Sequence, residues 1–504
     1  MLLPSSLGDA AQEGRQWSWL EVGLMVVVLA GLWFALAILV LRPVGKIGTA
    51  RGMWTVRGAE DGNRIQVGKE RRESPGLAWG EERTDRSAEG FWRRRRETIA
   101  QWCPGTWREE FASLQREGAL RNFSGEQGAA PLVSVATHTG WADRLTGAVT
   151  AFFVALLSGR PFMQTTYGSL ADLGAVMESP WIEWGMGWEE AEARWGGMEG
   201  ARHSFEGVEN NRDLRARQRY FEARNITLLY FFNGLMPLSW FVNTDFRQLL
   251  GAADRPAFMV NNRGRTLKIL AHSKHHGDAL RQLGLTERSI FPCGFDFLFQ
   301  PRPAVVNAAN GLLPRFLACD LRLAIHIRTG DSNLRGLERS SGTAPSPLSY
   351  FRCAQQIERW ALASLHSSSE ARSPTQSPRH SITVGWFVMS DSTYVRDYAA
   401  ARWSAPHRSI VVESFQPAHP VCVPSADETC ASDLLADAAV NSIASMFVFS
   451  AADVFILTKH SGYGAQSAWI SNHHDPVIYY GDQPDCSFAS RAPLDFVARH
   501  WSGL

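Results

Sequence analysis

The sequence LRLAIHIRTGD, residues 321–331, combines the pattern of a β-strand with a charged end. Apolar residues occupy every second position from 321 to 327, and a period of two is typical of a strand. His326, Arg328 and Asp331 gather at its C-terminal end. Ligands of open α/β sheets bind beyond the carboxyl ends of the strands, and the forked, permanently charged arginine side chain suits a diphosphate. The stretch therefore indicates a binding site, although a strand that ends in a surface ion pair shows the same pattern.

Strand and helix patterns alternate through the rest of the C-terminal half. The predicted strands are residues 381–391, 408–413 and 453–458, and the predicted helices are residues 348–365, 394–403, 433–450 and 465–470. This order is typical of an α/β domain with a doubly wound parallel sheet. Residues 367–381 are rich in Ser and Pro and are predicted to form a disordered loop.

Polar residues follow three of these strands. The first strand is followed by the charged residues already named, and the other two are followed by Ser390, Asp391, Ser461, Gly462 and Tyr463. Because parallel strands bring their carboxyl ends to one edge of a sheet, these side chains are expected to converge. A nucleotide with its phosphates is the ligand that suits them, since the last three residues open a helix whose free N–H groups favour an anion.

The N-terminal half contains a second α/β pattern. Residues 131–166 read as strand, turn, helix and strand, and the turn holds Gly140, Asp143 and Arg144. A helix N-terminus after such a turn is suited to an anion, but for these residues taken alone an ordinary tight turn with Asp143 as helix cap is the preferred interpretation. A helix is also expected at residues 107–120.

The segment at residues 261–301 suggests a short strand or turn, a helix that ends at Gly284, and an apolar loop. His272, His275 and His276 lie close together in it. No cysteine or carboxylate is spaced with them in a known ligand pattern, so no metal site is predicted.

Length and composition define the class of protein. The chain has 504 residues, of which 45% are hydrophobic, and this suits a globular protein with about three domains' worth of sequence. The net charge of +1 argues against a nucleic-acid partner.

Residues 22–41 form an uninterrupted apolar run long enough to cross a membrane as one helix. Residues 1–21 would then be a short tail, and residues 42–100, which are polar and mixed in charge, would be a solvated stem. The basic flank after the apolar run predicts a cytosolic C-terminal part. Two glycosylation sequons, at Asn122 and Asn225, point instead to the lumen.

The seven cysteines all follow the apolar run. Cys422 and Cys430 are near enough in sequence to close a small loop, and the odd number leaves at least one thiol over. Disulfide pairing in an oxidising compartment is a hypothesis that fits this distribution.

The motifs together resemble the GDP-fucose-dependent fucosyltransferase superfamily, which includes α1,2-, α1,6- and protein O-fucosyltransferases, and in particular its plant xyloglucan-type members. HIRTGD resembles the family's H-x-R-R-x-D element. The other similar motifs are GWADR (140–144), LLSGRPFM (156–163), NRG (262–264), C-x-x-x-FLF-x-P (293–301), SD (390–391) and S-x-x-D-x-x-I-x-T-x-x-SGYG (450–464).

This resemblance implies a GT-B fold, in which two Rossmann-like domains face a cleft. Residues 101–315 would be the acceptor-side domain and residues 316–495 the domain that binds the GDP-sugar. The implied enzyme is an inverting, metal-independent glycosyltransferase without a cofactor that transfers fucose from GDP-fucose to a glycan hydroxyl. It would be a single-pass type II protein of the Golgi membrane with a lumenal catalytic domain, against the indication of the charged flanks. Its expected partners are GDP-fucose, a glycan or polysaccharide acceptor, the membrane and a second copy in a homodimer.

Carried over to this sequence, Arg328 would hold the β-phosphate and stabilise the leaving group, while His326 and Asp331 would shape the nucleotide pocket. Asp391 would bind the guanine or the ribose, with Ser390 beside it. Ser461 and Gly462, next to Tyr463, would bind the diphosphate.

From the other domain, Gly140 and Arg144 would close over the sugar phosphate. Asp143 is a candidate general base. Two departures from the family pattern stand out: Thr329 replaces a second arginine, and Asp143 replaces an asparagine.

Two further interpretations stay open. The chain could be a GT-B transferase for another nucleotide sugar, which the missing arginine at position 329 favours. It could also be a non-catalytic, membrane-anchored glycan-binding protein on the same fold.

Overall fold

The computed structural model describes residues 85–124, 130–136, 140–166, 172–195, 226–231, 242–250, 255–261, 272–329, 346–370, 382–415, 432–459, 461–471, 477–481, 484, 486 and 491–492. The chain divides into two compact units, residues 1–72 and 73–504, and all the described residues belong to the second. The predicted membrane anchor at residues 22–41 lies outside the described residues, as does the tail before it. Among the helices of the described residues, none has the length and apolar character needed to cross a membrane.

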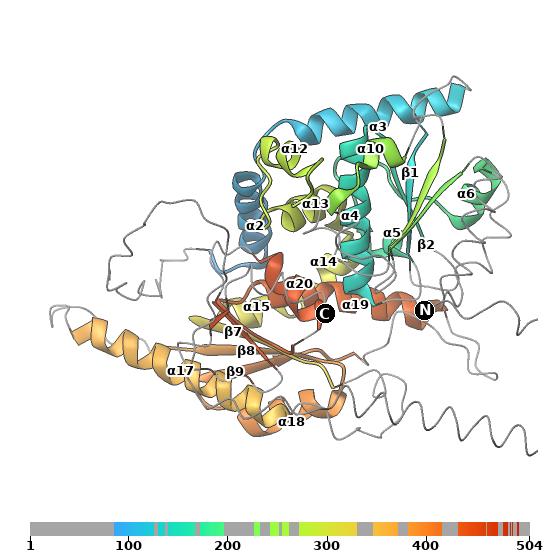
Figure 1. Cartoon of the computed structure of the whole chain (residues 1–504). Helices are drawn as coiled ribbons and strands as arrows, with labels where there is room; N and C mark the ends of the chain where they lie inside the picture. The colour runs from blue at the N-terminus through green and yellow to red at the C-terminus, as the bar shows by residue number, and fades with distance from the viewer. Residues whose placement is uncertain are drawn as a thin grey trace, which may run out of the picture. The chain divides into compact units, whose positions relative to one another are not determined.

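In its described residues the second unit is a mixed α/β structure with two larger sheets, whose strands are mostly parallel, and one two-stranded antiparallel sheet formed by β3 (Met177–Glu178) and β6 (Gln300–Pro301) (Figure 1). The first sheet has the strand order β2-β1-β5-β4, and all its neighbouring strands are parallel. Its strands are β1 (Leu132–Ala136), β2 (Phe162–Thr166), β4 (Thr227–Phe231) and β5 (Ala257–Asn261). Helix α4 (Trp141–Ser158) connects β1 to β2 and is buried along most of its length, as its largely apolar sequence predicts.

The second sheet has the order β12-β11-β10-β7-β8-β9 and is parallel except for β12. Its strands are β7 (Leu321–Ile327), β8 (Val384–Ser390), β9 (Arg408–Val412), β10 (Val454–Leu457), β11 (Val477–Tyr480) and β12 (Arg491–Ala492). The helices of this region are α14 (Pro303–Asn310), α15 (Leu313–Leu317), α17 (Pro347–Glu370), α18 (Thr393–Trp403), α19 (Ser432–Ser450) and α20 (Gly462–Trp469). The predicted α/β class is therefore confirmed.

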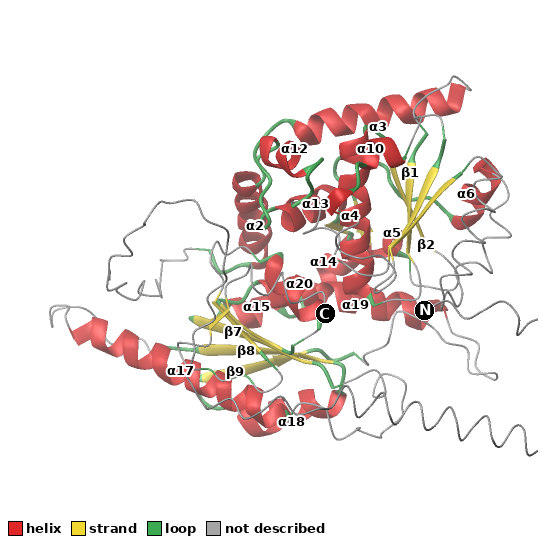
Figure 2. Cartoon of the chain, viewed as in Figure 1, coloured by secondary structure: helices red, strands yellow, loops and turns green. Residues whose placement is uncertain are grey.

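The alternation that predicted β7 is visible in its packing. Leu323 and Ile325 belong to the hydrophobic cluster that contains residues of α17 and α18, whereas Ala324 belongs to the cluster that contains residues of α19 and α20. Figure 2 shows these two groups of helices on opposite sides of the sheet. His326 lies two residues after Ala324, so its side chain shares the face of α19 and α20.

The predicted stem is wrong for its last part. Residues 88–102 form helix α2 (Ala88–Trp102), whose Phe91 and Ile99 are buried. Arg95, in the middle of an arginine run, is also buried: it lies over two phenylalanine rings and donates to a backbone carbonyl just beyond α20. The charge pattern suggested solvation because three arginines surround the buried one, but positions 91, 95 and 99 share one helical face, and the long apolar stem of Arg95 lets it take its place there.

Two other predictions need correction. The apolar loop expected before residue 301 is largely helix α13 (Ile290–Leu298), and Pro292 is accommodated because it lies in the first helical turn, where its missing N–H is not needed. The predicted disordered loop at residues 367–381 begins within α17, and residues 371–381 lie outside the described part.

The remaining described elements are α3 (Trp107–Ser124), α5 (Leu173–Val176), α6 (Trp188–Trp195), α10 (Phe246–Leu249) and α12 (Gly277–Gln282). The helix predicted at residues 107–120 is confirmed as α3, and the one that ends at Gly284 as α12 with a left-handed Gly284 at φ 75°. Asn122 lies in α3, and Asn225 lies outside the described residues.

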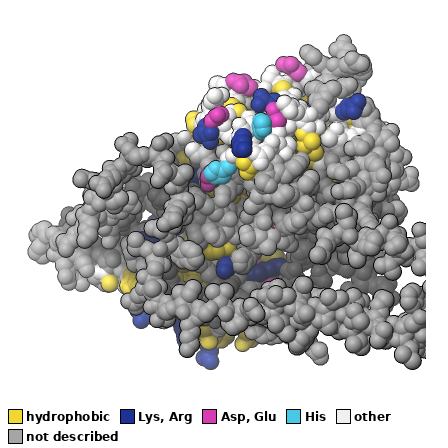
Figure 3. Space-filling view, in the orientation of Figure 1, with side chains coloured by type: hydrophobic (Ala, Val, Ile, Leu, Met, Phe, Trp, Pro, Cys, Tyr) yellow, Lys and Arg dark blue, Asp and Glu magenta, His cyan; other side chains and the backbone are white. Residues whose placement is uncertain are grey.

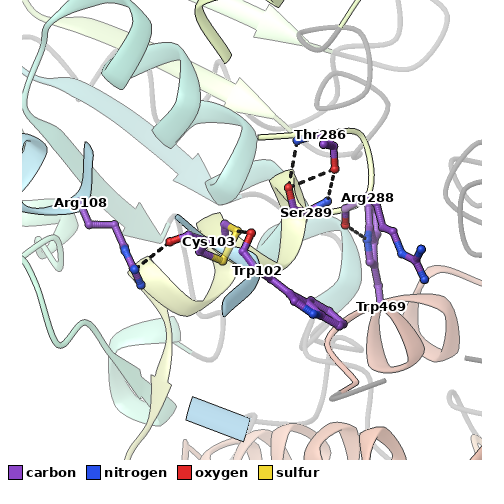
Figure 4. Close-up of a disulfide and its surroundings, with 8 residues drawn as sticks. Trp102, Cys103, Arg108, Thr286, Arg288, Ser289 and Trp469 are labelled. Carbon is purple, nitrogen blue, oxygen red and sulfur yellow. Dashed lines mark hydrogen bonds between the residues drawn. A yellow bond between two sulfur atoms is a disulfide. The ribbon is translucent and has the colours of Figure 1, made fainter. Parts of the chain in front are cut away.

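Two disulfides connect distant parts of the chain. Cys103, directly after α2, pairs with Cys293 on α13, and Cys353 on α17 pairs with Cys486. Figure 4 shows the first of them beside Trp469 of α20, whose indole N–H donates to the carbonyl of Arg288 at 2.9 Å. Cys319 is a buried free thiol, and Cys422 and Cys430 lie outside the described residues. The first disulfide therefore ties α2 to the region where α13 meets α20.

Candidate functional site

Three neighbouring strands of the second sheet end level with one another. His326 on β7 is paired with Leu457 on β10, and Ile327 on β7 is paired with Ser390 on β8. The polar residues that follow these strands are consequently brought to one edge, as their positions in the sequence predicted. The structure places Arg328, Asp391 and Ser461 just after β7, β8 and β10.

Arg328 and Thr329 are held by Asp391. The Asp391 carboxylate accepts hydrogen bonds from the Thr329 backbone N–H and hydroxyl, both at 2.8 Å, and one of its oxygens lies 3.3 Å from a terminal nitrogen of Arg328. The Asp391 side chain is 4% exposed, whereas that of Arg328 is 32% exposed. Asp391 therefore fixes the loop after β7 while the arginine stays accessible, and its predicted contact with guanine or ribose stays a prediction.

Thr458, which follows β10, fastens the same loop from the other side. Its hydroxyl donates to the carbonyl of His326 at 2.9 Å and accepts from the N–H of Arg328 at 3.0 Å. Sequence reasoning assigned no role to this residue, although a threonine that closes an apolar strand is a signal for such a bridge. Arg328 is thus positioned by Asp391 of the β8 end and Thr458 of the β10 end.

His326 is buried and neutral. Burial, followed by the nearby charge of Arg328, lowers the pKa of His326 to about 3. Its Nδ1 atom is buried and has no hydrogen-bond partner among the described residues. The ring lies against Gly464 in the first turn of α20, where an added Cβ would approach the His326 Cγ to 2.6 Å. Only glycine allows α20 to lie this close to β7.

The buried imidazole predicts a pH dependence of stability. In the unfolded chain a histidine titrates near pH 6.5, but in the folded chain His326 stays neutral down to about pH 3. Between these values the unfolded state binds one more proton at this site, so stability falls as the pH is lowered, by about 1.4 kcal/mol per pH unit. His326→Gln removes this contribution, and urea unfolding at pH 7, 6 and 5 should show a shallower slope for the variant.

Glu413, the residue after β9, also changes its protonation in this pH range, so its effect has to be separated from that of His326. The pKa of Glu413 is raised from 4.5 to about 7. Between these values the folded state binds one more proton at Glu413, so this residue makes stability rise as the pH is lowered, opposite to the effect of His326. Because Glu413 is the same in both proteins, the difference between them isolates His326. Identical pH slopes for the wild type and His326→Gln would contradict a neutral buried imidazole.

The residues around the start of α20 differ in what their side chains do. Ser461 is the N-cap residue of α20, yet its hydroxyl makes no capping bond among the described residues. Gly462 is the first helical residue, and the hydroxyl of the partly buried Tyr463 donates to the carbonyl of Ser442 on α19. Ser390 instead uses its hydroxyl within the sheet, where it donates to the carbonyl of Ile327 at 2.8 Å. The N-terminal end of α20 therefore keeps a hydroxyl and N–H groups for an anion.

A buried ion pair lies at the end of β9, beside this helix. The Glu413 carboxylate is 3.0 Å from a terminal nitrogen of Arg396 on α18, and both side chains are almost fully buried. Burial raises the pKa of Glu413 to about 7, while Arg396 opposes the shift. Burial and the Glu413 charge together raise the pKa of Tyr463. The sequence analysis did not single out this pair, because nothing in the order of residues shows that α18, β9 and α20 meet here.

The residues predicted from the first sheet lie at and near the start of α4. Gly140 is the N-cap of α4, and Asp143 is partly exposed in the first turn. Arg144 is only 2% exposed, lies over the Trp141 ring at 5.2 Å, and has a pKa lowered to about 10 by burial, against the effect of Asp172. Arg144 is thus buried against Trp141 of α4, and its expected contact with a sugar phosphate stays a prediction.

Helices α4 and α20 are nevertheless in direct contact. The side-chain amide of Gln466 on α20 donates to the carbonyl of Ala142 at 2.6 Å and to the hydroxyl of Thr146. Ala142 precedes Asp143, so the first turn of α4 lies alongside α20. Asp331, the third charged residue of the opening motif, lies outside the described residues.

The three histidines at residues 272–276 have separate partners. His272 pairs with Glu287, His275 contacts the carbonyl of Asn243 at 3.1 Å, and His276 accepts from the N–H of Phe246 at 2.9 Å. Figure 3 shows acidic, basic and histidine side chains intermixed on the coloured part of the surface at the top of the view. Within the described residues no group of histidine, cysteine or carboxylate side chains is arranged to hold a metal ion.

Comparisons with known proteins give structural likenesses only. No family model matches the sequence, and no curated protein matches it. The chain is similar to the structure of a mutant of Arabidopsis thaliana FUT1 in complex with GDP, with a TM-score of 0.47 and 14% identity over 80% of this chain and 81% of that one. It is also similar to the NodZ α-1,6-fucosyltransferase soaked with GDP-fucose, with a TM-score of 0.40 and 11% identity over 71% of this chain and 97% of that one. At TM-scores below 0.5 such a likeness does not establish a shared activity.

Proposed function

We propose that this chain is a glycosyltransferase that binds a GDP-sugar, GDP-fucose in particular, at the carboxyl edge of the second sheet. The observation that carries the proposal is the joint position of Arg328 and the N-terminal end of α20. An accessible arginine follows β7, and the uncapped start of α20 follows the neighbouring strand β10. Two positive partners on adjacent strands suit a diphosphate, which carries its charge on two linked groups.

His326 positions the start of α20 at this edge, because its neutral ring packs against Gly464 in the first turn of that helix. A protonated imidazole beside Arg328 would add a buried charge, whereas the neutral ring keeps a buried Nδ1 that can donate or accept a hydrogen bond. The motif HIRTGD, through its resemblance to the fucosyltransferase element, supports guanosine as the nucleoside and fucose as the sugar.

The reaction follows from these groups. The acceptor hydroxyl oxygen attacks C1 of the sugar, the bond from C1 to the β-phosphate oxygen breaks with its electron pair on that oxygen, and a base takes the hydroxyl proton. Arg328 and the α20 N–H groups stabilise the charge that develops on the phosphate, so no metal ion is required for this task. Attack opposite the leaving group inverts the configuration at C1.

Asp143 is the proposed base. It is partly exposed in the first turn of α4, and the residue before it contacts α20. This contact places the first turn of α4 beside the helix that would hold the diphosphate. A carboxylate there is suited to receive the proton of an acceptor hydroxyl.

We further propose the GT-B architecture, with the first sheet in the acceptor-side domain and the second sheet in the donor domain. A single membrane anchor at residues 22–41 and a lumenal location in the Golgi complete the proposal. The two disulfides support an oxidising compartment.

A second candidate function, a GT-B transferase for another nucleotide sugar, rests on Thr329. Its hydroxyl and N–H bind Asp391, so this position supplies no second cation for the phosphates. A donor whose phosphates need less positive charge would then be used.

Hydrolysis of nucleotide sugars by the full-length protein tests the proposal. We expect slow release of fucose from GDP-fucose, with inverted configuration in the first-formed product and no change with EDTA. GDP-mannose and UDP-sugars are the comparison donors. Release from a UDP-sugar alone would favour the second candidate, and the absence of any binding of GDP or GDP-fucose would overturn the first.

A further inference from the structure

Tyr394 is the most exposed large apolar side chain in the described part of the second unit. It is 73% exposed, whereas the next in order, Leu249, is 39% exposed. A ring this exposed is accessible to a ligand, and aromatic rings are the side chains on which bases stack.

The position of Tyr394 is set by the end of β8. Asp391 follows β8, Ser392 is the N-cap of α18 and accepts from the N–H of Val395, and Tyr394 is the second residue of the helix. Side chains of a helix lean toward its N-terminus, so Tyr394 leans toward the edge of the sheet where Asp391 lies.

The Tyr394 ring packs on one side against another aromatic ring. Tyr394 and Tyr398, one helical turn apart, are stacked with centroids 6.2 Å apart and planes 29° apart, and Tyr398 in turn contacts Phe351 of the core. One side of the Tyr394 ring is therefore braced on a layer of aromatic rings, while most of its surface is open to solvent.

The spacing of the strands fits a nucleoside diphosphate. The start of α20 follows β10, and the start of α18 follows β8, with β7 between them. Neighbouring strands are about 4.8 Å apart, so the ends of β10 and β8, which lead to helices on opposite faces of the sheet, are about 10 Å apart along the edge. This is the scale of the distance between the base and the β-phosphate of a nucleoside diphosphate.

We infer that Tyr394 is the stacking platform for the base of the nucleotide whose phosphates lie at Arg328 and the start of α20. The inference rests on the proposed function and adds the residue that holds the base. Asp391 has only 4% of its side chain exposed and is engaged by Thr329 and Arg328, whereas the Tyr394 ring beside it is open to a base.

Titrations of the full-length protein with GDP and with inorganic pyrophosphate test this inference. Stacking of a base on an aromatic ring contributes about 1–3 kcal/mol, so Tyr394→Ala should weaken GDP binding by about 5- to 150-fold. Pyrophosphate lacks a base, and its affinity should be unchanged. Tyr394→Phe should bind GDP like the wild type, because stacking needs the ring and not the hydroxyl.

Trp360→Ala is the matched control. Trp360 is another exposed aromatic residue of the same region but lies within α17, and its removal should change neither affinity. Unchanged GDP binding by Tyr394→Ala would overturn the inference, as would an equal loss for GDP and pyrophosphate or a loss in Tyr394→Phe. A wild type that does not bind GDP overturns the proposed function itself, so the two failures are distinguishable.

Discussion

Arg328→Ala is expected to weaken the binding of GDP by about 10- to 150-fold. A hydrogen bond between charged groups contributes about 1.5–3 kcal/mol, and this loss in binding free energy corresponds to that range of affinity. The loop should keep its shape, because Asp391 still accepts from the N–H and the hydroxyl of Thr329. The loss would therefore report the missing charge, and calorimetric titration measures it directly.

Two variants make this prediction specific. Arg328→Lys keeps the charge but loses the planar fork, so its affinity should fall between those of the wild type and the alanine variant. Arg359→Ala removes an exposed arginine of α17 and should bind GDP like the wild type. Wild-type affinity in Arg328→Ala would show that the diphosphate is held elsewhere.

Glu413→Ala is expected to lower the free energy of unfolding by about 3–5 kcal/mol, because it leaves the buried guanidinium of Arg396 without its carboxylate. Arg396→Met should cost less below pH 7. In that variant Glu413 can take up a proton and become neutral, a change that its pKa of about 7 already favours. Urea unfolding of both variants at pH 6 measures the difference.

An exposed pair provides the control for this buried one. Asp278 pairs with Arg281 on the surface of α12, and Asp278→Ala should leave the unfolding midpoint almost unchanged, since solvent screens such pairs. If Glu413→Ala were as mild as Asp278→Ala, the carboxylate would not be buried against Arg396 in solution.

The sequence was most informative where periodicity and chemistry coincide. The alternation in residues 321–327 identified β7, and the polar residues after β7, β8 and β10 were expected at one edge because the strands are parallel. That expectation needs only the direction of the strands, and direction follows from the helix that joins each pair.

The sequence was least informative where the outcome depends on packing between distant segments. Arg95 looked solvated because its neighbours are arginines, yet the contact with the end of α20 buries it. Likewise, Arg144 looked available at a helix start, but the ring of Trp141 covers it. Long side chains with apolar stems can occupy either environment, and only the surrounding structure decides between them.

Glu413 and Thr458 show the same limit at the site itself. Each is a single polar residue at the end of an apolar strand, and each acquires its role from a partner more than fifteen residues away: Arg396 for the first, and the backbone of β7 for the second. The local sequence can mark a polar residue at a strand end, but it does not identify the distant partner.

Hydrogen–deuterium exchange of the full-length protein with and without GDP tests the central claim most directly. The account predicts slower exchange on GDP binding in the peptides that cover residues 326–329 and the first turn of α20, because the bound diphosphate would cover the loop that carries Arg328 and the start of that helix. Peptides from β4 and β5 of the first sheet should exchange at unchanged rates. Protection confined to other parts of the chain, with none at residues 326–329 or at α20, would contradict the assignment of this edge as the nucleotide site.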